Sequence, residues 1–131
     1  MKEEGGRRRK DEVMPVDLRT RTKQFALRII RLFSALSKNT EGQVIGKQLL
    51  RSGTSVGAHY REATRARSDA EFISKIEGGL QELEESVYWM ELLAESGIVS
   101  PLRLEDLQKE ADELTAILIT CVKKTKNRRE G

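Results

Sequence analysis

Apolar side chains recur at steps of three and four along most of the chain, and this is the period of an α-helix. The pattern predicts four amphipathic helices separated by short links. The first is expected to begin near Asp17, a suitable capping residue, and to end at Asn39. Its apolar face consists of Phe25, Ile29, Leu32, Phe33 and Leu36.

The second predicted helix spans about 41–66 and passes through a run of small residues. Thr40 and Gln43 fit a capping box at its start. Its apolar period continues through the glycines, so we expect one helix and not two pieces. The residues in register are Ile45, Leu49, Ser52, Val56, His59 and Ala63.

Ser68 and Glu71 form the clearest capping box in the chain and predict the start of a third helix. Gly97 is expected to end it as a left-handed cap, and Pro101 fits the first turn of a fourth helix. The apolar stripe of the third helix is Phe72, Ile76, Leu80, Leu83, Val87, Met90 and Leu93. That of the fourth is Leu107, Ala111, Leu114, Leu118 and Cys121.

These helices predict an all-α fold, an up-down-up-down antiparallel four-helix bundle over residues 17–124. A mobile charged arm, 1–16, is expected before it and a basic tail, 125–131, after it. A glycine inside a helix costs about 1 kcal/mol relative to alanine, so we interpret the small residues as allowing close approach of another helix. Counting outward from Arg67 places Gly57 level with Gly78 and Gly79, which predicts close backbone approach there.

Composition narrows the class of protein. A chain of 131 residues has room for one core. Its single cysteine, Cys121, cannot form an internal disulfide, and neither a signal peptide nor a long apolar run is present. We therefore expect a cytoplasmic protein that does not enter a membrane.

The net charge of +3 hides a division along the chain. Residues 17–67 hold eleven basic and three acidic side chains, whereas residues 68–122 hold three basic and thirteen acidic ones. From Lys123 onward the chain is basic again. Such a chain can neutralise much of its own charge, within a subunit or between neighbours, before an outside partner is needed.

The sequence contains partial matches to catalytic and metal-binding motifs, but the residues around them do not fit those motifs. Gly53 to Gly57 matches the G-x-S-x-G motif of hydrolases, but that motif needs a preceding strand, and helical periodicity lies on both sides here. A di-iron bundle needs Glu-x-x-His on two helices, whereas His59 is the single histidine and has Val56 three positions earlier. We expect no enzymatic activity, no metal and no cofactor.

Basic residues are the candidates for binding a ligand that the sequence indicates. They suit backbone-directed, salt-sensitive contact with nucleic acid, and Arg7 to Lys10 adds a further cluster. The candidate nucleic-acid-binding residues are Arg21, Lys23, Arg28, Arg31, Arg51, Arg61, Arg65, Arg67, Lys123, Lys124, Lys126, Arg128 and Arg129. Solubility and pairing with the acidic helices are the alternative role for the same residues.

A second set of residues is expected to serve helix packing or subunit contacts. Tyr88 and Trp89 suit either the edge of the core or an interface anchor. The full set is Gly53, Ser55, Gly57, His59, Gly78, Gly79, Tyr88 and Trp89.

Several ordered segments resemble the small four-helix-bundle family named for proteins encoded in 23S rRNA intervening sequences. The matching segments are 51–58, 62–63, 72–75, 84–89 and 92–93. His59 departs from the family, which usually has Asn at this position. The resemblance implies a four-helix bundle, commonly a ring-shaped homopentamer, without enzymatic activity. It also implies kinship to accessory proteins of diversity-generating retroelements, which bind nucleic acid beside a reverse transcriptase.

We therefore predict a homo-oligomeric bundle that binds RNA or DNA non-specifically as an accessory or scaffold factor. Its partners would be further copies of itself, nucleic acid such as ribosomal RNA, or a reverse transcriptase. The alternative is a protein–protein assembly module with no nucleic-acid ligand. Attachment to a membrane surface is weaker, because the apolar face of the first helix is needed in the core.

Overall fold

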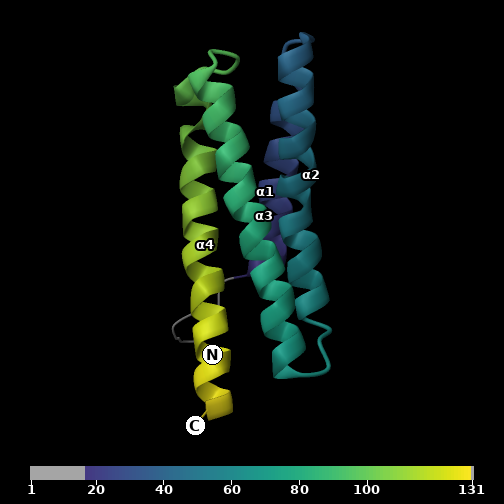
Figure 1. Cartoon of the computed structure of the whole chain (residues 1–131), viewed down its shortest axis with the longest axis vertical. Coiled ribbons are helices and arrows are strands. Elements are labelled where there is room, and N and C mark those ends of the chain that lie inside the picture. Colours follow the sequence, from purple (N-terminus) through teal and green to yellow (C-terminus); the bar gives the residue numbers. More distant parts are fainter. Residues whose placement is uncertain (1–16, 131) are drawn as a thin grey trace, which may run out of the picture.

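The computed structural model describes residues 17–130, and its elements are four α-helices. They are α1 (Leu18–Ser34), α2 (Thr40–Ala63), α3 (Asp69–Glu95) and α4 (Pro101–Glu130). The helices run alternately up and down, and each packs against its neighbours in the order α1, α2, α3, α4 and back to α1 (Figure 1). This is the predicted antiparallel four-helix bundle. The predicted arm, 1–16, lies outside the described residues.

The predicted apolar faces meet in one core. Residues that are fully buried come from every helix, so each helix contributes part of its amphipathic stripe. They include Phe25, Ile29, Leu49, Val56, Ile76, Leu83, Met90, Leu93, Leu104, Leu114 and Leu118. Burial of such side chains contributes about 1.5–3 kcal/mol each and is the main force that holds the helices together.

The link between α1 and α2 differs from the prediction. The first helix ends at Ser34, with Ala35 as its C-cap, so Asn39 does not end it. Asn39 instead caps α2, because its side-chain oxygen accepts the backbone N–H of Gly42 at 2.7 Å. Thr40 is therefore the first helical residue and not the cap, and the Gln43 side chain donates to the Ser37 carbonyl.

The predicted ends of α3 are confirmed. The Ser68 hydroxyl accepts the Glu71 backbone N–H at 3.0 Å. The Glu71 carboxylate, in turn, accepts the backbone N–H of Arg67, one residue earlier than a standard capping box requires. At the other end Gly97 has a φ of 81°, and the Ile98 N–H donates to the Leu93 carbonyl, which is the Schellman arrangement. The fourth helix begins at Pro101, as predicted.

The second helix passes unbroken through its small residues and ends at Ala63, slightly earlier than predicted. The backbones of α2 and α3 approach each other at the predicted level, but Gly57 does not face Gly78 and Gly79. A Cβ built on Gly57 would lie 3.2 Å from the Thr22 hydroxyl, so this glycine faces α1. A Cβ on Gly79 would lie 3.8 Å from the Val56 carbonyl oxygen, so α3 does approach α2 closely there. Val56 and Gly57 differ because successive residues point about 100° apart around a helix.

The fourth helix continues beyond the predicted boundary at Lys124. Residues 125–130 are helical and not a separate tail, and the Thr125 side chain is only 5% exposed. By contrast, α1 has 17 residues against 30 in α4. It begins part-way along the bundle, so only α2, α3 and α4 form the end near the chain's C-terminus (Figure 1).

Candidate nucleic-acid interface

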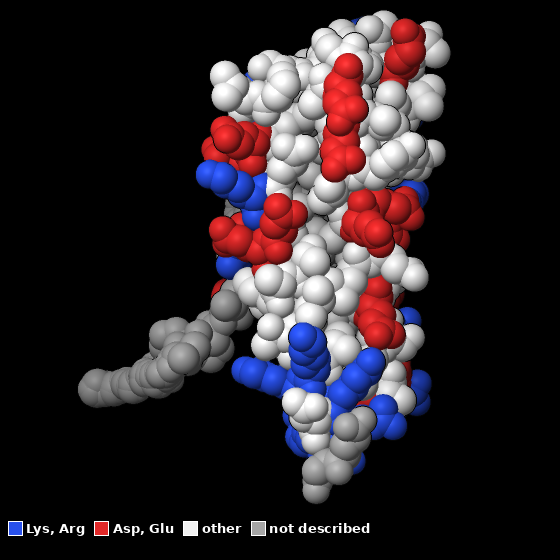
Figure 2. Space-filling view, turned by 60° about the vertical axis from the view of Figure 1, so that its left-hand side comes forward, with Lys and Arg blue, Asp and Glu red and all other residues white. Residues whose placement is uncertain are grey.

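Seven of the candidate cations gather at the end of the bundle that α1 does not reach. The turn from α2 to α3 and the last two turns of α4 meet there, because α2 and α4 run in the same direction (Figure 1). We call this surface the basic end. It consists of Arg65, Arg67, Lys123, Lys124, Lys126, Arg128 and Arg129, all exposed to solvent, and Figure 2 shows Lys and Arg side chains gathered there.

Most of this positive charge is not neutralised by the described residues. Arg128 lies 3.0 Å from the Asp69 carboxylate, and Lys126 lies 3.9 Å from that of Glu77. The other members of the basic end form no ion pair with any residue from 17 to 129. The C-terminal end of a helix carries a partial negative charge, so α4 tolerates cations in its last turns. The basic end therefore presents an excess of positive charge to solvent.

The body of the bundle has the opposite charge on α3 and α4. Residues 82–95 of α3 include five acidic side chains and no basic one. Residues 105–113 of α4 include five acidic side chains and one lysine. Figure 2 shows carboxylates along this face and cations at the end of α4. Charge is thus separated along the long axis of the molecule.

Two candidate arginines are already paired with neighbouring helices. Arg21 of α1 donates from Nε to Glu110 at 3.0 Å and from Nη2 to Glu113 at 2.9 Å, which joins α1 to α4. Hydrogen bonds to Glu110 and then to Glu113 raise the pKa of Arg21 above its usual value. Arg51 of α2 pairs with Glu82 at 3.3 Å and with Glu85, which joins α2 to α3.

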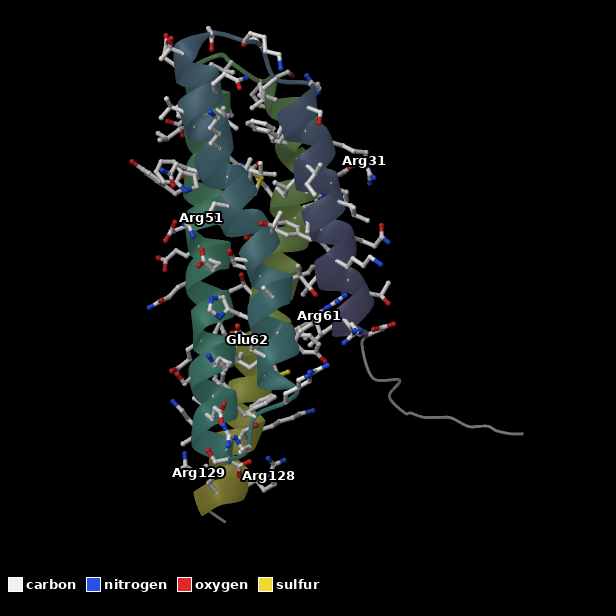
Figure 3. All side chains as sticks on the ribbon, turned by 90° about the vertical axis from the view of Figure 1, so that its right-hand side faces the viewer. Arg31, Arg51, Arg61, Glu62, Arg128 and Arg129 are labelled. Atoms are coloured by element: carbon white, nitrogen blue, oxygen red, sulfur yellow. The ribbon has the colours of Figure 1, made fainter. Side chains whose placement is uncertain are left out.

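The remaining candidates lie on the α1 side of the bundle. Lys23 and Arg61 line a shallow groove of about 370 Å³ between α1 and α2, together with the small residues Ala26, Gly57 and Ala58. Arg28 and Arg31 line a second shallow surface with Arg103 and Asp106 of α4. Figure 3 shows Arg31 and Arg61 well separated from Arg128 and Arg129. The thirteen sequence candidates therefore do not form one continuous site.

The residues expected to serve packing occupy different environments. Gly53 and Gly57 receive α1, since Cβ atoms there would meet Ile29 and Thr22. The His59 ring lies over Gly78, with its nitrogens 3.6 Å and 3.8 Å from Glu62 and Glu82. The hydroxyl of Ser55 donates to the Arg51 carbonyl of its own helix.

The adjacent aromatic residues of α3 occupy different environments. Tyr88 is 52% exposed, whereas Trp89 is half-buried and packs against the core. Their ring centroids are 5.0 Å apart. Trp89 therefore lies at the edge of the core, the first of the two predicted roles. Tyr88 lies at the surface beside Gln81, Glu84 and Glu85, where it could contact another subunit.

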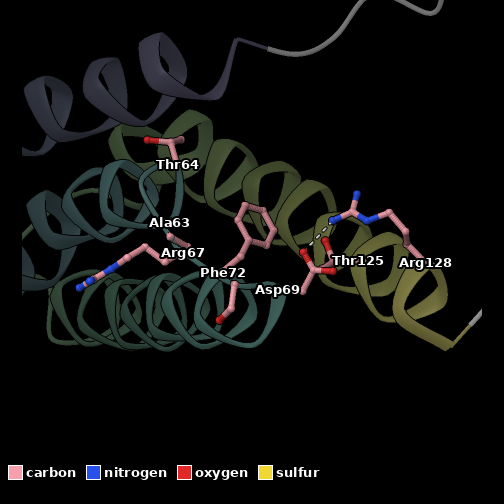
Figure 4. A pocket seen from close by; sticks show the side chains of 9 residues that line it. Ala63, Thr64, Arg67, Asp69, Phe72, Thr125 and Arg128 are labelled. Atoms are coloured by element: carbon pink, nitrogen blue, oxygen red, sulfur yellow. Dashed lines mark hydrogen bonds and ion pairs between the residues drawn. The ribbon is translucent and has the colours of Figure 1, made fainter.

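A hollow of about 420 Å³ opens within the basic end, between the end of α2, the start of α3 and the last turns of α4 (Figure 4). We call it the end hollow. It is lined by Ala63, Thr64, Ala66, Arg67, Ser68, Asp69, Phe72, Thr125 and Arg128. Sequence reasoning assigned Phe72 to the core and did not identify this site. No sequence signal identified it, because the hollow depends on where α1 begins relative to the end of α4.

Metal and membrane sites are not indicated in the part of the chain that the structure describes. Residues 17–130 contain no group of three potential metal-ligating side chains of the His, Cys, Asp or Glu type. None of the four helices combines the length and the apolar character needed to cross a bilayer. The basic end and the end hollow are therefore the chemically distinctive surfaces of the described chain.

Sequence comparison places the bundle in a family. Residues 16–120 match the profile of a family described as 23S rRNA-intervening sequence protein. The chain belongs to this family. No curated protein matches the chain significantly.

A solved structure agrees with this membership. The chain is similar to a protein of unknown function from the S23 ribosomal protein family of Bacteroides thetaiotaomicron. The two share 37% identity with a TM-score of 0.77, over 81% of this chain and 98% of the other. The family match ends at residue 120, so the cations of Lys123 to Arg129 lie beyond the matched residues.

Proposed function

We propose that this member of the 23S rRNA-intervening sequence family is a non-enzymatic nucleic-acid-binding bundle that contacts the phosphate backbone of RNA or DNA through its basic end. The observation that carries the proposal is the group of exposed cations there that form no ion pair with residues 17–129: Arg65, Arg67, Lys123, Lys124 and Arg129. Exposed ammonium and guanidinium groups attract phosphates of any sequence. The protein would act as an accessory or scaffold factor.

Binding of this kind has a measurable dependence on salt. Five phosphate contacts release about five counterions, so log K should fall with log salt concentration at a slope of about −4.5 on a duplex. Between 50 and 200 mM salt the affinity would then fall by a factor of about 500.

Self-association would multiply these contacts. We propose that the protein forms a homo-oligomer, with the ring-shaped pentamer of the family resemblance as the expected state. Two surfaces support it: Tyr88 projects from the acidic face of α3, and Lys23 and Arg61 flank the shallow groove between α1 and α2. An exposed aromatic residue among carboxylates is complementary to a groove between cations.

Neutralisation of the basic end tests the nucleic-acid proposal. The triple variant Lys123→Gln, Lys124→Gln and Arg129→Gln removes three of these five cations. A matched control, Lys38→Gln, Lys47→Gln and Lys109→Gln, removes the same charge from exposed positions elsewhere. We expect the first variant to reduce the salt slope to about −2 and the control to retain it. Equal losses in both variants, or no binding by the wild type at low salt, would overturn the proposal.

The second candidate function is a protein-assembly module, which the Tyr88 surface favours. Light scattering of the wild type and of Tyr88→Ser tests it independently of nucleic acid. We expect the wild type to be an oligomer. The variant should dissociate at a higher protein concentration than the wild type does. A monomeric wild type at micromolar concentration would contradict self-association. Oligomers that bind no nucleic acid would favour the assembly module over the leading proposal.

A further inference from the structure

The end hollow exists because the helices differ in length. The first helix begins at Leu18, part-way along the bundle, and α2 ends at Ala63. The last turns of α4 continue past both points to Glu130. Phe72, in the first turn of α3, is therefore covered by core residues on one side and is only half-buried. In Figure 4 its ring lies between the end of α2 and Thr125 of α4.

We infer that the end hollow receives one unpaired nucleobase of a single-stranded RNA or DNA, stacked on Phe72. This inference rests on the proposed function, because the surrounding cations would hold the strand. Single-strand binding sites combine a positively charged surface with aromatic rings on which bases stack. The basic end has both features, with its aromatic ring inside the hollow and its cations around the rim.

The walls of the hollow suit a flat ring with a polar edge. Ala63 and Ala66 are small enough to leave room beside Phe72. The Thr64 hydroxyl donates its hydrogen to the Arg61 carbonyl at 2.7 Å. Its oxygen therefore keeps lone pairs to accept a hydrogen bond from an amino or imino group of a base. A volume of about 420 Å³ is within the range of small-molecule sites.

Cations stand on both sides of this hollow. Arg67 lines it from the α2–α3 turn. Arg128 lines it from α4 and is held there by Asp69 at 3.0 Å. Lys124 precedes Arg128 by one helical turn and so lies on the same face of α4. A strand with one base in the hollow would have its flanking phosphates within reach of these side chains.

The inference predicts a preference that charge alone would not give. A base in a duplex must be unstacked and unpaired before it can enter the hollow, and this costs binding free energy. A single strand has unpaired bases already. We therefore expect tighter binding of a single-stranded 12-nucleotide RNA than of a 12-base-pair duplex at equal salt.

The decisive variant is Phe72→Leu, which keeps an apolar side chain against the core and removes the aromatic ring. We expect its affinity for the single strand to fall about 5- to 30-fold, with duplex affinity unchanged. The matched control is Phe33→Leu, the same change at another half-buried ring that packs against the core, in the last turn of α1 at the opposite end of the bundle, and it should leave both affinities unchanged. An equal loss for both ligands with Phe72→Leu, or no loss for either, would overturn the inference.

A second variant and a crosslinking experiment test the inference even if Phe72→Leu fails to fold. Thr64→Leu removes an exposed hydroxyl and narrows the hollow without touching the core, so it should also weaken single-strand binding selectively. An RNA that carries 5-iodouracil should crosslink on irradiation to Phe72. A crosslink only to residues outside the hollow would overturn the inference. A wild type that binds neither ligand at low salt would instead defeat the proposed function.

Discussion

Two serine side chains connect α2 to α3 inside the core. Ser52 and Ser86 are fully buried, and their hydroxyl oxygens lie 2.9 Å apart. The Ser86 hydroxyl also lies 2.8 Å from the Glu82 carbonyl and the Ser52 hydroxyl 3.3 Å from the Leu49 carbonyl, so either hydroxyl can be the donor between the two. Small side chains at both positions let the helices approach, and the shared hydrogen bond satisfies polar atoms that burial would otherwise leave unpaired.

The serine pair gives a first prediction. Ser86→Ala removes the side-chain hydrogen-bond partner of the Ser52 hydroxyl and should lower the free energy of unfolding by about 1 kcal/mol. Because the two side chains share one hydrogen bond, the double variant with Ser52→Ala should cost about 0.5 kcal/mol less than the sum of the single changes. Urea denaturation of the four proteins measures this coupling. Strict additivity would mean that the hydroxyls do not interact in solution.

Two glycines predict opposite effects of the same substitution. A Cβ on Gly53 would lie 2.8 Å from Cγ1 and 3.1 Å from Cγ2 of Ile29, a β-branched side chain with little freedom to move. Gly53→Ala should therefore destabilise the protein by about 1–3 kcal/mol. A Cβ on Gly79 would have no neighbour closer than 3.6 Å. Gly79→Ala should stabilise the protein by up to about 1 kcal/mol, because alanine is the better helix former. Thermal unfolding distinguishes the two signs.

At the scale of the elements, the apolar period predicted all four helices, but local chemistry decided their ends. Ser68 and Gly97 were predicted correctly because each makes its contacts within a few residues of the chain. Asn39 and Thr40 are adjacent, and both are good capping residues. The choice between them depends on the path of the link from α1, which the sequence pattern does not contain.

The start of α1 predicts a dependence on pH. The Asp17 carboxylate accepts the Thr20 hydroxyl at 2.7 Å and its backbone N–H at 3.0 Å, and these bonds lower the pKa of Asp17 below 3.8. The stabilisation is therefore complete above about pH 3.8 and is lost as the pH falls through the lower pKa of the folded protein.

Asp17→Asn keeps an acceptor that does not titrate, and other carboxylates titrate equally in both proteins. The urea midpoint of the wild type should exceed that of Asp17→Asn at pH 6, with the difference disappearing at strongly acidic pH. A difference that is constant from pH 6 to acidic pH would show that the Asp17 charge does not stabilise α1.

At the scale of the whole molecule, some of the candidate cations form ion pairs with acidic side chains of the bundle, whereas others form none with residues 17–129. The sequence identified the cations but not their partners, since Arg21 and Glu110 are 89 positions apart. It also could not reveal the end hollow, because the hollow depends on where α1 begins relative to the end of α4. The fold was predictable from local periodicity, whereas the site depends on helix lengths and on contacts between distant segments.

The Arg21 contact should hold the bundle closed. The edge between α1 and α4 is the least extensively packed of the four, and Arg21 crosses it to Glu110 and Glu113. Arg21→Gln should lower the free energy of unfolding by about 1 kcal/mol, since the group is partly exposed. Amide hydrogen exchange should increase chiefly in α1. Glu113→Gln, which leaves the contact with Glu110, should have a smaller effect on the same amides.

The separation of charge along the long axis has a consequence for how the protein meets a polyanion. With carboxylates on the upper halves of α3 and α4 and cations at the basic end, the molecule has a permanent electric dipole moment. In the field of a nucleic acid it would experience a torque that turns the basic end forward before contact. Such orientation accelerates encounter, and the acceleration disappears as salt shortens the Debye length to about 8 Å.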